Sequence, residues 1–112
     1  MVPPTPQQRA EARRLARSLA ELGFILPGTM TERLTRCGKP NCACGAEPPR
    51  LHGPYHQWTR KVAAKTVTRL MSDAQYAEYQ PWMQNWRKLR ALVAELETLS
   101  LGIVEADSRW DS

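Results

Sequence analysis

The sequence predicts a small α+β protein with an N-terminal helix, a three-stranded antiparallel sheet carrying a zinc knuckle, and a long C-terminal amphipathic helix. Three observations lead to this prediction. Apolar residues recur at helical spacing near both ends, the middle alternates between apolar and polar residues, and three cysteines lie close together. A chain of 112 residues builds one modest core, which a bound metal ion would help to stabilise.

The first helix is predicted over Gln7–Leu22. Thr5 can cap its start, with Pro6 at the first helical position, and Gly23 stands where a C-terminal cap belongs. Residues 1–6 are expected to form a mobile arm because they contain three prolines. The apolar face has three- and four-residue spacing and consists of Ala12, Leu15, Ala16, Leu19 and Leu22.

Three strands are predicted in the middle of the chain, over Thr29–Arg36, Tyr55–Val62 and Lys65–Met71. In the second strand, the alternation turns Trp58 and Val62 inward. The outward-facing residues of that strand are Gln57, Thr59 and Lys61. The hairpin is therefore expected to carry Arg, Lys and Thr side chains on a polar face.

The C-terminal helix is expected to run from Pro81 to Leu101. The residues Ser72–Gln75 have the capping-box pattern of a helix start, and Pro81 is expected to break or restart that helix. A single domain then covers residues 7–104, and residues 105–112 form a frayed tail. The apolar stripe of this helix is wide and includes Trp82, Trp86, Leu89, Val93 and Leu96.

The cysteines predict a structural zinc site. Cys37, Cys42 and Cys44 cannot all pair in disulfides, and nothing in the N-terminal sequence suggests export. Zinc takes four ligands in a tetrahedron, so the simplest fourth ligand is His52, with His56 as the second choice. The alternative is three reduced thiols, partly buried in a loop rich in Gly and Pro.

Positive charge is concentrated in the middle of the chain, which favours a polyanionic partner. The net charge is +5, and half of the Lys and Arg residues lie between Glu32 and Arg69 with only two acidic residues. We therefore expect binding to nucleic acid, most simply double-stranded DNA, and a solvated surface without a partner is the alternative. The expected contacts are Arg36, Lys39, Arg50, Arg60, Lys61, Lys65 and Arg69. The stripe of Arg9, Arg13 and Arg17 on the first helix is interpreted as a solvated face.

The sequence has no pattern typical of an enzyme or of a membrane-spanning protein. No paired carboxylates, phosphate-binding Gly loop or oriented nucleophile are evident, so we do not expect an enzyme. The longest apolar run is far too short for a membrane span, and a cytoplasmic location is expected. The main alternative is a protein-interaction adaptor or dimerisation module that binds a transposase, a recombinase or a second copy through the last helix. A further alternative is a single-strand or RNA binder that stacks bases on Tyr55 and Trp58.

Several segments resemble a small bacterial family of unknown function. They are R-C-G-K-P-N-C-A-C at Arg36–Cys44, H-G-P-Y at His52–Tyr55, and W-R-K-L-R at Trp86–Arg90. The resemblance implies a gene often encoded beside transposases and other mobile-element genes. The family usually has Gly where this chain has Ala64, so we expect a loop slightly wider than a tight turn. The hairpin followed by a helix is also similar, at the level of fold alone, to the arm-binding domains of tyrosine integrases.

Overall fold

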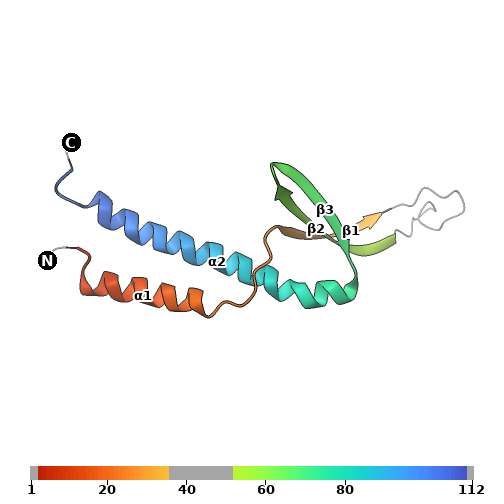
Figure 1. Cartoon of the computed structure of the whole chain (residues 1–112), viewed down its shortest axis with the longest axis horizontal. Coiled ribbons are helices and arrows are strands. Elements are labelled where there is room, and N and C mark those ends of the chain that lie inside the picture. Colours follow the sequence, from red (N-terminus) through yellow and green to blue (C-terminus); the bar gives the residue numbers. More distant parts are fainter. Residues whose placement is uncertain (1–2, 36–51, 111–112) are drawn as a thin grey trace, which may run out of the picture. The chain divides into compact units, whose positions relative to one another are not determined.

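The computed structural model describes residues 3–35 and 52–110, and of Thr35 and His52 it describes the backbone only. The elements follow in the order α1 (Pro6–Ala20), β1 (Thr29–Thr35), β2 (His52–Val62), β3 (Lys65–Met71) and α2 (Asp73–Glu105) (Figure 1). The predicted α+β class is therefore confirmed. The predicted zinc knuckle lies outside the described residues.

The chain divides into two compact units. The helical unit contains residues 1–25 and 84–112, and the sheet unit contains residues 26–83. Helix α2 contributes to both units, since Asp73–Glu105 crosses the boundary between them. The single domain predicted over residues 7–104 stays a prediction.

Helix α1 begins where the sequence predicts. The hydroxyl of Thr5 accepts a hydrogen bond from the backbone N–H of Gln8, and the Gln8 side chain accepts one from the backbone N–H of Thr5. This reciprocal capping box satisfies two N–H groups that a helix start leaves unpaired. The helix ends earlier than predicted, with Glu21 as the C-terminal cap in place of Gly23.

The helical unit is held together by an apolar contact between α1 and the second half of α2. Leu15 of α1 and Leu92 of α2 are buried, and Leu15 lines a hollow with Leu99 of α2. Asn85 of α2 donates a hydrogen bond of 2.9 Å to the carbonyl oxygen of Phe24. The segment that follows α1 is thereby fixed to α2.

Helix α2 is longer than predicted because Pro81 does not break it. Its start has the predicted capping box, in which Ser72 and Gln75 exchange hydrogen bonds between side chain and backbone. The helix then continues for 33 residues with Pro81 in its interior. After Glu105, the chain turns, and Trp110 donates a hydrogen bond from its indole nitrogen to the carbonyl oxygen of Val104.

The three strands form one antiparallel sheet in the order β1-β2-β3. Ala63 and Ala64 connect β2 to β3 with φ angles of +50° and +67°. Positive φ at both central residues is the pattern of a two-residue type I′ turn. The prediction of a wider loop was therefore wrong, and the tight turn forms without glycine.

The register assigns the strand residues to two faces. Residues directly opposite each other across antiparallel strands lie on the same face. The tryptophan face carries Met30 and Glu32 from β1, His56, Trp58, Arg60 and Val62 from β2, and Lys65, Val67, Arg69 and Met71 from β3. The threonine face carries Thr29, Thr31 and Arg33 from β1, Tyr55, Gln57, Thr59 and Lys61 from β2, and Thr66, Thr68 and Leu70 from β3. Trp58 is half-buried as predicted, whereas Val62 is exposed, which corrects the prediction that it points inward.

In the described parts of the chain, no helix combines the length and the apolar composition needed to cross a bilayer.

Candidate nucleic-acid interface

Four of the predicted contact residues lie on one hairpin of the structure. Arg60 and Lys61 are in β2, and Lys65 and Arg69 are in β3. The backbone of His52 starts β2 and pairs with Thr35, the last residue of β1. The other predicted residues lie outside the described part of the chain: Arg36, Cys37, Lys39, Cys42, Cys44 and Arg50.

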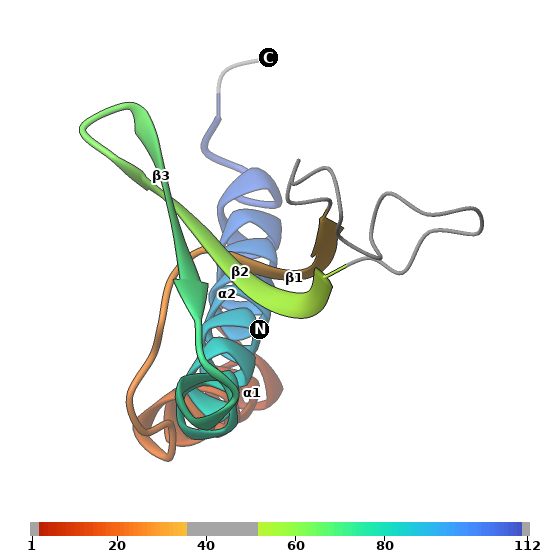
Figure 2. The ribbon, with the colours of Figure 1, turned by 90° about the vertical axis from the view of Figure 1, so that its right-hand side faces the viewer.

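The far end of the hairpin is a ribbon of only two strands. Strand β1 pairs with β2 as far as Thr59, and residues 60–67 continue beyond it as β2 and β3 alone. We call residues 60–67 the ribbon. Figure 2 shows the hairpin extending past the end of β1. Residues 61–66 are all exposed, so both faces of the ribbon are open to a partner.

The strand alternation divides the four cations between the two faces. Arg60, Lys65 and Arg69 lie on the tryptophan face, and Lys61 lies on the threonine face. The sequence prediction had grouped these side chains on one polar face, and the register brings only three of them together. A further cation of the sheet, Arg33, was not among the predicted contacts and lies at the other end of the threonine face from Lys61. Its alternation with Thr29 and Thr31 could have placed it there.

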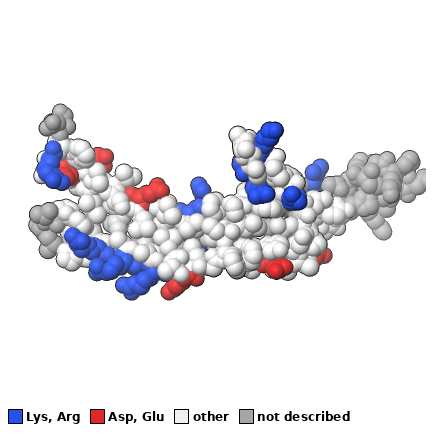
Figure 3. Space-filling model, viewed as in Figure 1, with Lys and Arg blue, Asp and Glu red and all other residues white. Residues whose placement is uncertain are grey.

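The ribbon is cationic and has no carboxylates of its own. Residues 52–72 contain no Asp or Glu. Among the described residues, no carboxylate forms an ion pair with Arg60, Lys61, Lys65 or Arg69. Blue Lys and Arg side chains gather over the hairpin in Figure 3. The positive electrostatic potential of these side chains is therefore available to attract an anion.

Arg60 is positioned by the tryptophan next to it on the same face. Its guanidinium carbon lies 4.9 Å from the centroid of the Trp58 ring, and its Nε is buried with no hydrogen-bond partner among the described residues. Trp58 donates a hydrogen bond of 3.0 Å from its indole nitrogen to the carbonyl oxygen of Pro27. These contacts fix Arg60 against the sheet, whereas Lys65 is exposed next to the turn.

The threonine face is polar and is held by side-chain hydrogen bonds. The Thr59 and Thr68 hydroxyl oxygens are 3.2 Å apart across the strands. Lys61 donates a hydrogen bond of 2.9 Å to the Thr66 hydroxyl. The ammonium of Lys61 is thus held over the ribbon while it stays accessible to solvent.

The two rings considered for base stacking do not form one platform. Tyr55 belongs to the threonine face and Trp58 to the tryptophan face, so a single strand could not stack on both at once. One side of the Trp58 ring also carries the Arg60 guanidinium.

His56 joins the sheet to the start of α2. Its ring stacks on Tyr76 with centroids 3.8 Å apart and an interplanar angle of 6°. Its Nε2 lies 3.7 Å from a carboxylate oxygen of Asp73. Glu32 is its cross-strand neighbour on the tryptophan face. His56 therefore has partners of its own inside the sheet unit.

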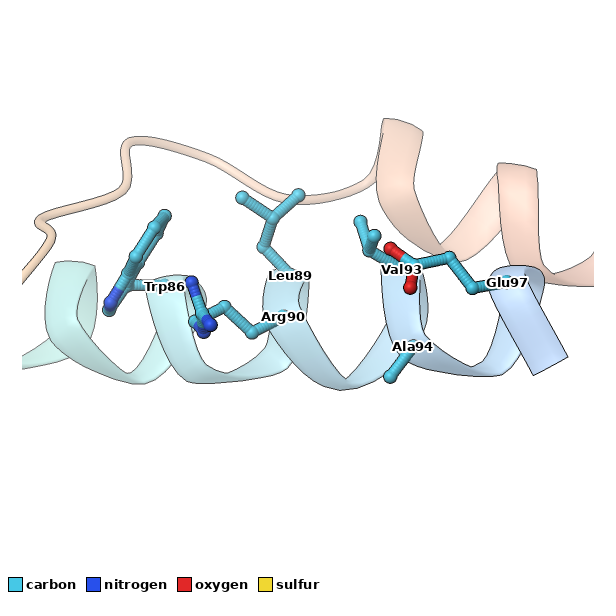
Figure 4. A pocket seen from close by; sticks show the side chains of 6 residues that line it. All are labelled: Trp86, Leu89, Arg90, Val93, Ala94 and Glu97. Atoms are coloured by element: carbon cyan, nitrogen blue, oxygen red, sulfur yellow. The ribbon is translucent and has the colours of Figure 1, made fainter.

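Two further surfaces lie in the helical unit. Arg9, Arg13 and Arg17 are exposed along α1, where Figure 3 shows a second blue group. A shallow groove follows α2, and Figure 4 shows Leu89 pointing toward the segment after α1. The groove is lined by Trp86, Leu89, Arg90, Val93, Ala94 and Glu97.

A family model described as a domain of unknown function, DUF6788, matches residues 6–81. The chain belongs to this family. The DUF6788 match begins with α1, includes all three strands and ends inside α2 at Pro81. This agrees with the resemblance to a family of unknown function. No curated protein and no solved structure matches the chain.

Proposed function

We propose that this DUF6788 protein is an accessory protein that binds double-stranded DNA through its basic hairpin and carries a structural zinc ion. The observation that carries the proposal is the ribbon: three cations in eight residues, with no acidic residue among them and no ion pair to a described carboxylate. An unpaired cation on an exposed strand releases condensed counterions when it contacts a phosphate.

The proposed zinc site uses Cys37, Cys42 and Cys44 with His52 as the fourth ligand. The pairing of Thr35 with His52 supports this choice, because it places His52 beside the end of β1, and residues 36–51 between these two positions include all three cysteines. His56 already contacts Tyr76 and Asp73 and lies four residues further along β2. Four protein ligands leave no position for a substrate, so the ion would stabilise the fold.

The biological setting is also a proposal. The resemblance to proteins encoded beside transposases suggests a role linked to mobile elements, in the cytoplasm, where DNA is accessible.

A protein-interaction adaptor is the second candidate, and one observation favours it. Apolar side chains remain exposed along α2, with Leu101 59% and Val104 46% exposed. A second copy, a transposase or a recombinase could cover them. An adaptor would bind its partner with no salt-sensitive affinity for DNA.

The test is the salt dependence of DNA binding, measured by fluorescence anisotropy on a labelled 20-base-pair duplex. We expect Lys65→Ala to weaken binding to unrelated sequences alike and to flatten the plot of log K against log salt by about 0.9. The matched control is Lys88→Ala, at an exposed position of α2 in the helical unit, which should leave the slope unchanged. Equal slopes for the wild type and Lys65→Ala, or no binding by the wild type, would refute the proposal.

A further inference from the structure

We propose that the ribbon enters the major groove of B-form DNA with its Ala63–Ala64 turn leading, so that its two faces meet the two phosphate backbones that border the groove. This inference rests on the proposed function and specifies how the hairpin carries it out. The feature that points to it is the division of cations between the two ribbon faces.

A sheet that lies with one face on a nucleic acid needs cations on that face alone. Here Lys61 extends from the threonine face, and Lys65 extends from the tryptophan face at the same end of the ribbon. Both are exposed, and neither forms an ion pair with a described carboxylate. A ligand that neutralises both must present phosphates on two opposite sides.

The ribbon has dimensions that suit the major groove. Packed sheets stand about 10 Å apart, so one ribbon with its side chains is about 10 Å thick. The major groove of B-form DNA is about 12 Å wide and admits a two-stranded ribbon, whereas the minor groove is about 6 Å wide. The small Ala63 and Ala64 side chains add little bulk at the leading turn.

Other nucleic acids do not fit this arrangement. A-form RNA has a deep and narrow major groove. A single strand has one phosphate backbone, so it would engage one ribbon face at a time. Arg69 lies beside Trp58, where the sheet has three strands, and would contact the backbone next to the inserted ribbon.

The experiment compares Lys61→Ala, Lys65→Ala and the double variant of the full chain, each on duplex DNA, duplex RNA and single-stranded DNA of equal length. On duplex DNA, we expect each single variant to reduce the salt slope by about 0.9 and the double variant by about 1.8. At 0.1 M salt, each lost contact corresponds to about eightfold weaker binding. On single-stranded DNA, the salt slope of the double variant should fall by no more than that of one single variant.

Two controls protect this interpretation. Lys61→Arg and Lys65→Arg keep the charge and should keep the slope, and circular dichroism should show that the alanine variants remain folded. Competition identifies the groove: a major-groove ligand such as methyl green should lower the protein's affinity, and the minor-groove ligand distamycin should not.

The outcomes separate the two proposals. If only Lys65→Ala changes the slope, the hairpin binds DNA through one face, which overturns the inference and leaves the proposed function. Displacement of the protein by distamycin but not by methyl green would also overturn the inference. So would a double variant whose salt slope falls as much on single-stranded DNA as on duplex DNA. A wild-type protein that binds no nucleic acid would overturn both.

Discussion

Gly28, where the chain enters β1, has a conformation and surroundings that exclude a side chain. Its φ is +116°, and a Cβ atom there would lie 2.5 Å from the Thr59 carbonyl oxygen and 2.9 Å from the Trp58 indole nitrogen. We expect Gly28→Ala to lower the free energy of unfolding by at least about 1–3 kcal/mol, because the backbone must move or remain strained. Urea denaturation measures this change.

The same substitution at Gly102 is the matched control for Gly28. Gly102 is in α2 and has open space where a Cβ would be placed. Gly102→Ala should therefore raise the free energy of unfolding, by about 0.5–1 kcal/mol. If Gly28→Ala unfolds like the wild type, the close packing of Gly28 against β2 is incorrect.

Asp107 has a lowered pKa because Arg109 donates hydrogen bonds to its carboxylate. The side chain of Arg109 has the larger effect and its backbone N–H the smaller one. The ionised carboxylate therefore supports the turn after α2 at neutral pH, and this support is lost as the pH falls through the lowered pKa. We expect Arg109→Gln to raise the pKa of Asp107 toward the ordinary value of about 3.9. Carbon-detected NMR titration of the carboxyl group measures it.

Arg14→Gln is the control for that titration. It removes the partner of Glu11, whose pKa is lowered by the hydrogen bond from Arg14, and should leave Asp107 unchanged. A pKa of Asp107 that does not respond to Arg109→Gln would show that this pair does not form in solution.

At the scale of elements, local signals predicted where helices and strands begin, and they failed where longer-range contacts override them. The capping boxes at Thr5 and Ser72 involve neighbouring residues and could be predicted from sequence. Pro81 carries a cost of about 3 kcal/mol in a helix interior, which suggested a break. Helix α2 nevertheless continues through Pro81, and next to it the Trp82 carbonyl oxygen accepts a hydrogen bond from the backbone N–H of Leu26, a contact that no short window of sequence shows.

The turn between β2 and β3 holds Ala64 in a conformation that glycine adopts more easily. An alanine in the left-handed region costs about 1–2 kcal/mol, and here the register of β2 with β3 imposes that conformation on Ala64. We expect Ala64→Gly to raise the free energy of unfolding by about 0.5–1 kcal/mol in urea denaturation. The control, Ala91→Gly at an exposed position of α2, should lower it by about 1 kcal/mol. If Ala64→Gly lowers the free energy of unfolding as much as Ala91→Gly does, the type I′ turn is contradicted.

At the scale of the whole molecule, composition predicted a basic middle segment but not how the fold distributes it. The charge count identified the hairpin cations, and only the register shows that Lys61 and Lys65 extend from opposite faces. The cysteine spacing suggested zinc, although it lacks the pairs of cysteines separated by two residues that are typical of zinc sites. Spacing alone could not decide between His52 and His56 as the fourth ligand. The stacking of His56 on Tyr76 depends on the packing of α2 on the sheet.

Metal removal tests the proposed site in the whole protein. Protein purified without chelator should contain about one zinc per chain by mass spectrometry, and EDTA should lower its melting temperature by several degrees. His52→Ala should lose most of the zinc, whereas His56→Ala should retain it. Zinc-free protein with three reactive thiols would contradict the site, and loss on His56→Ala alone would reassign the fourth ligand.

The outer edge of β3 has a consequence for self-association. In the described sheet, β3 pairs on one side only, with β2, so its other side offers unpaired N–H and C=O groups to any strand that approaches. Lys65 and Arg69 lie on that edge strand, and the repulsion between their charges in two copies opposes edge-to-edge pairing of the copies. The charges proposed to meet phosphates would thus also oppose aggregation. A variant that loses both charges would bind DNA with a weaker dependence on salt and would form fibrils more readily.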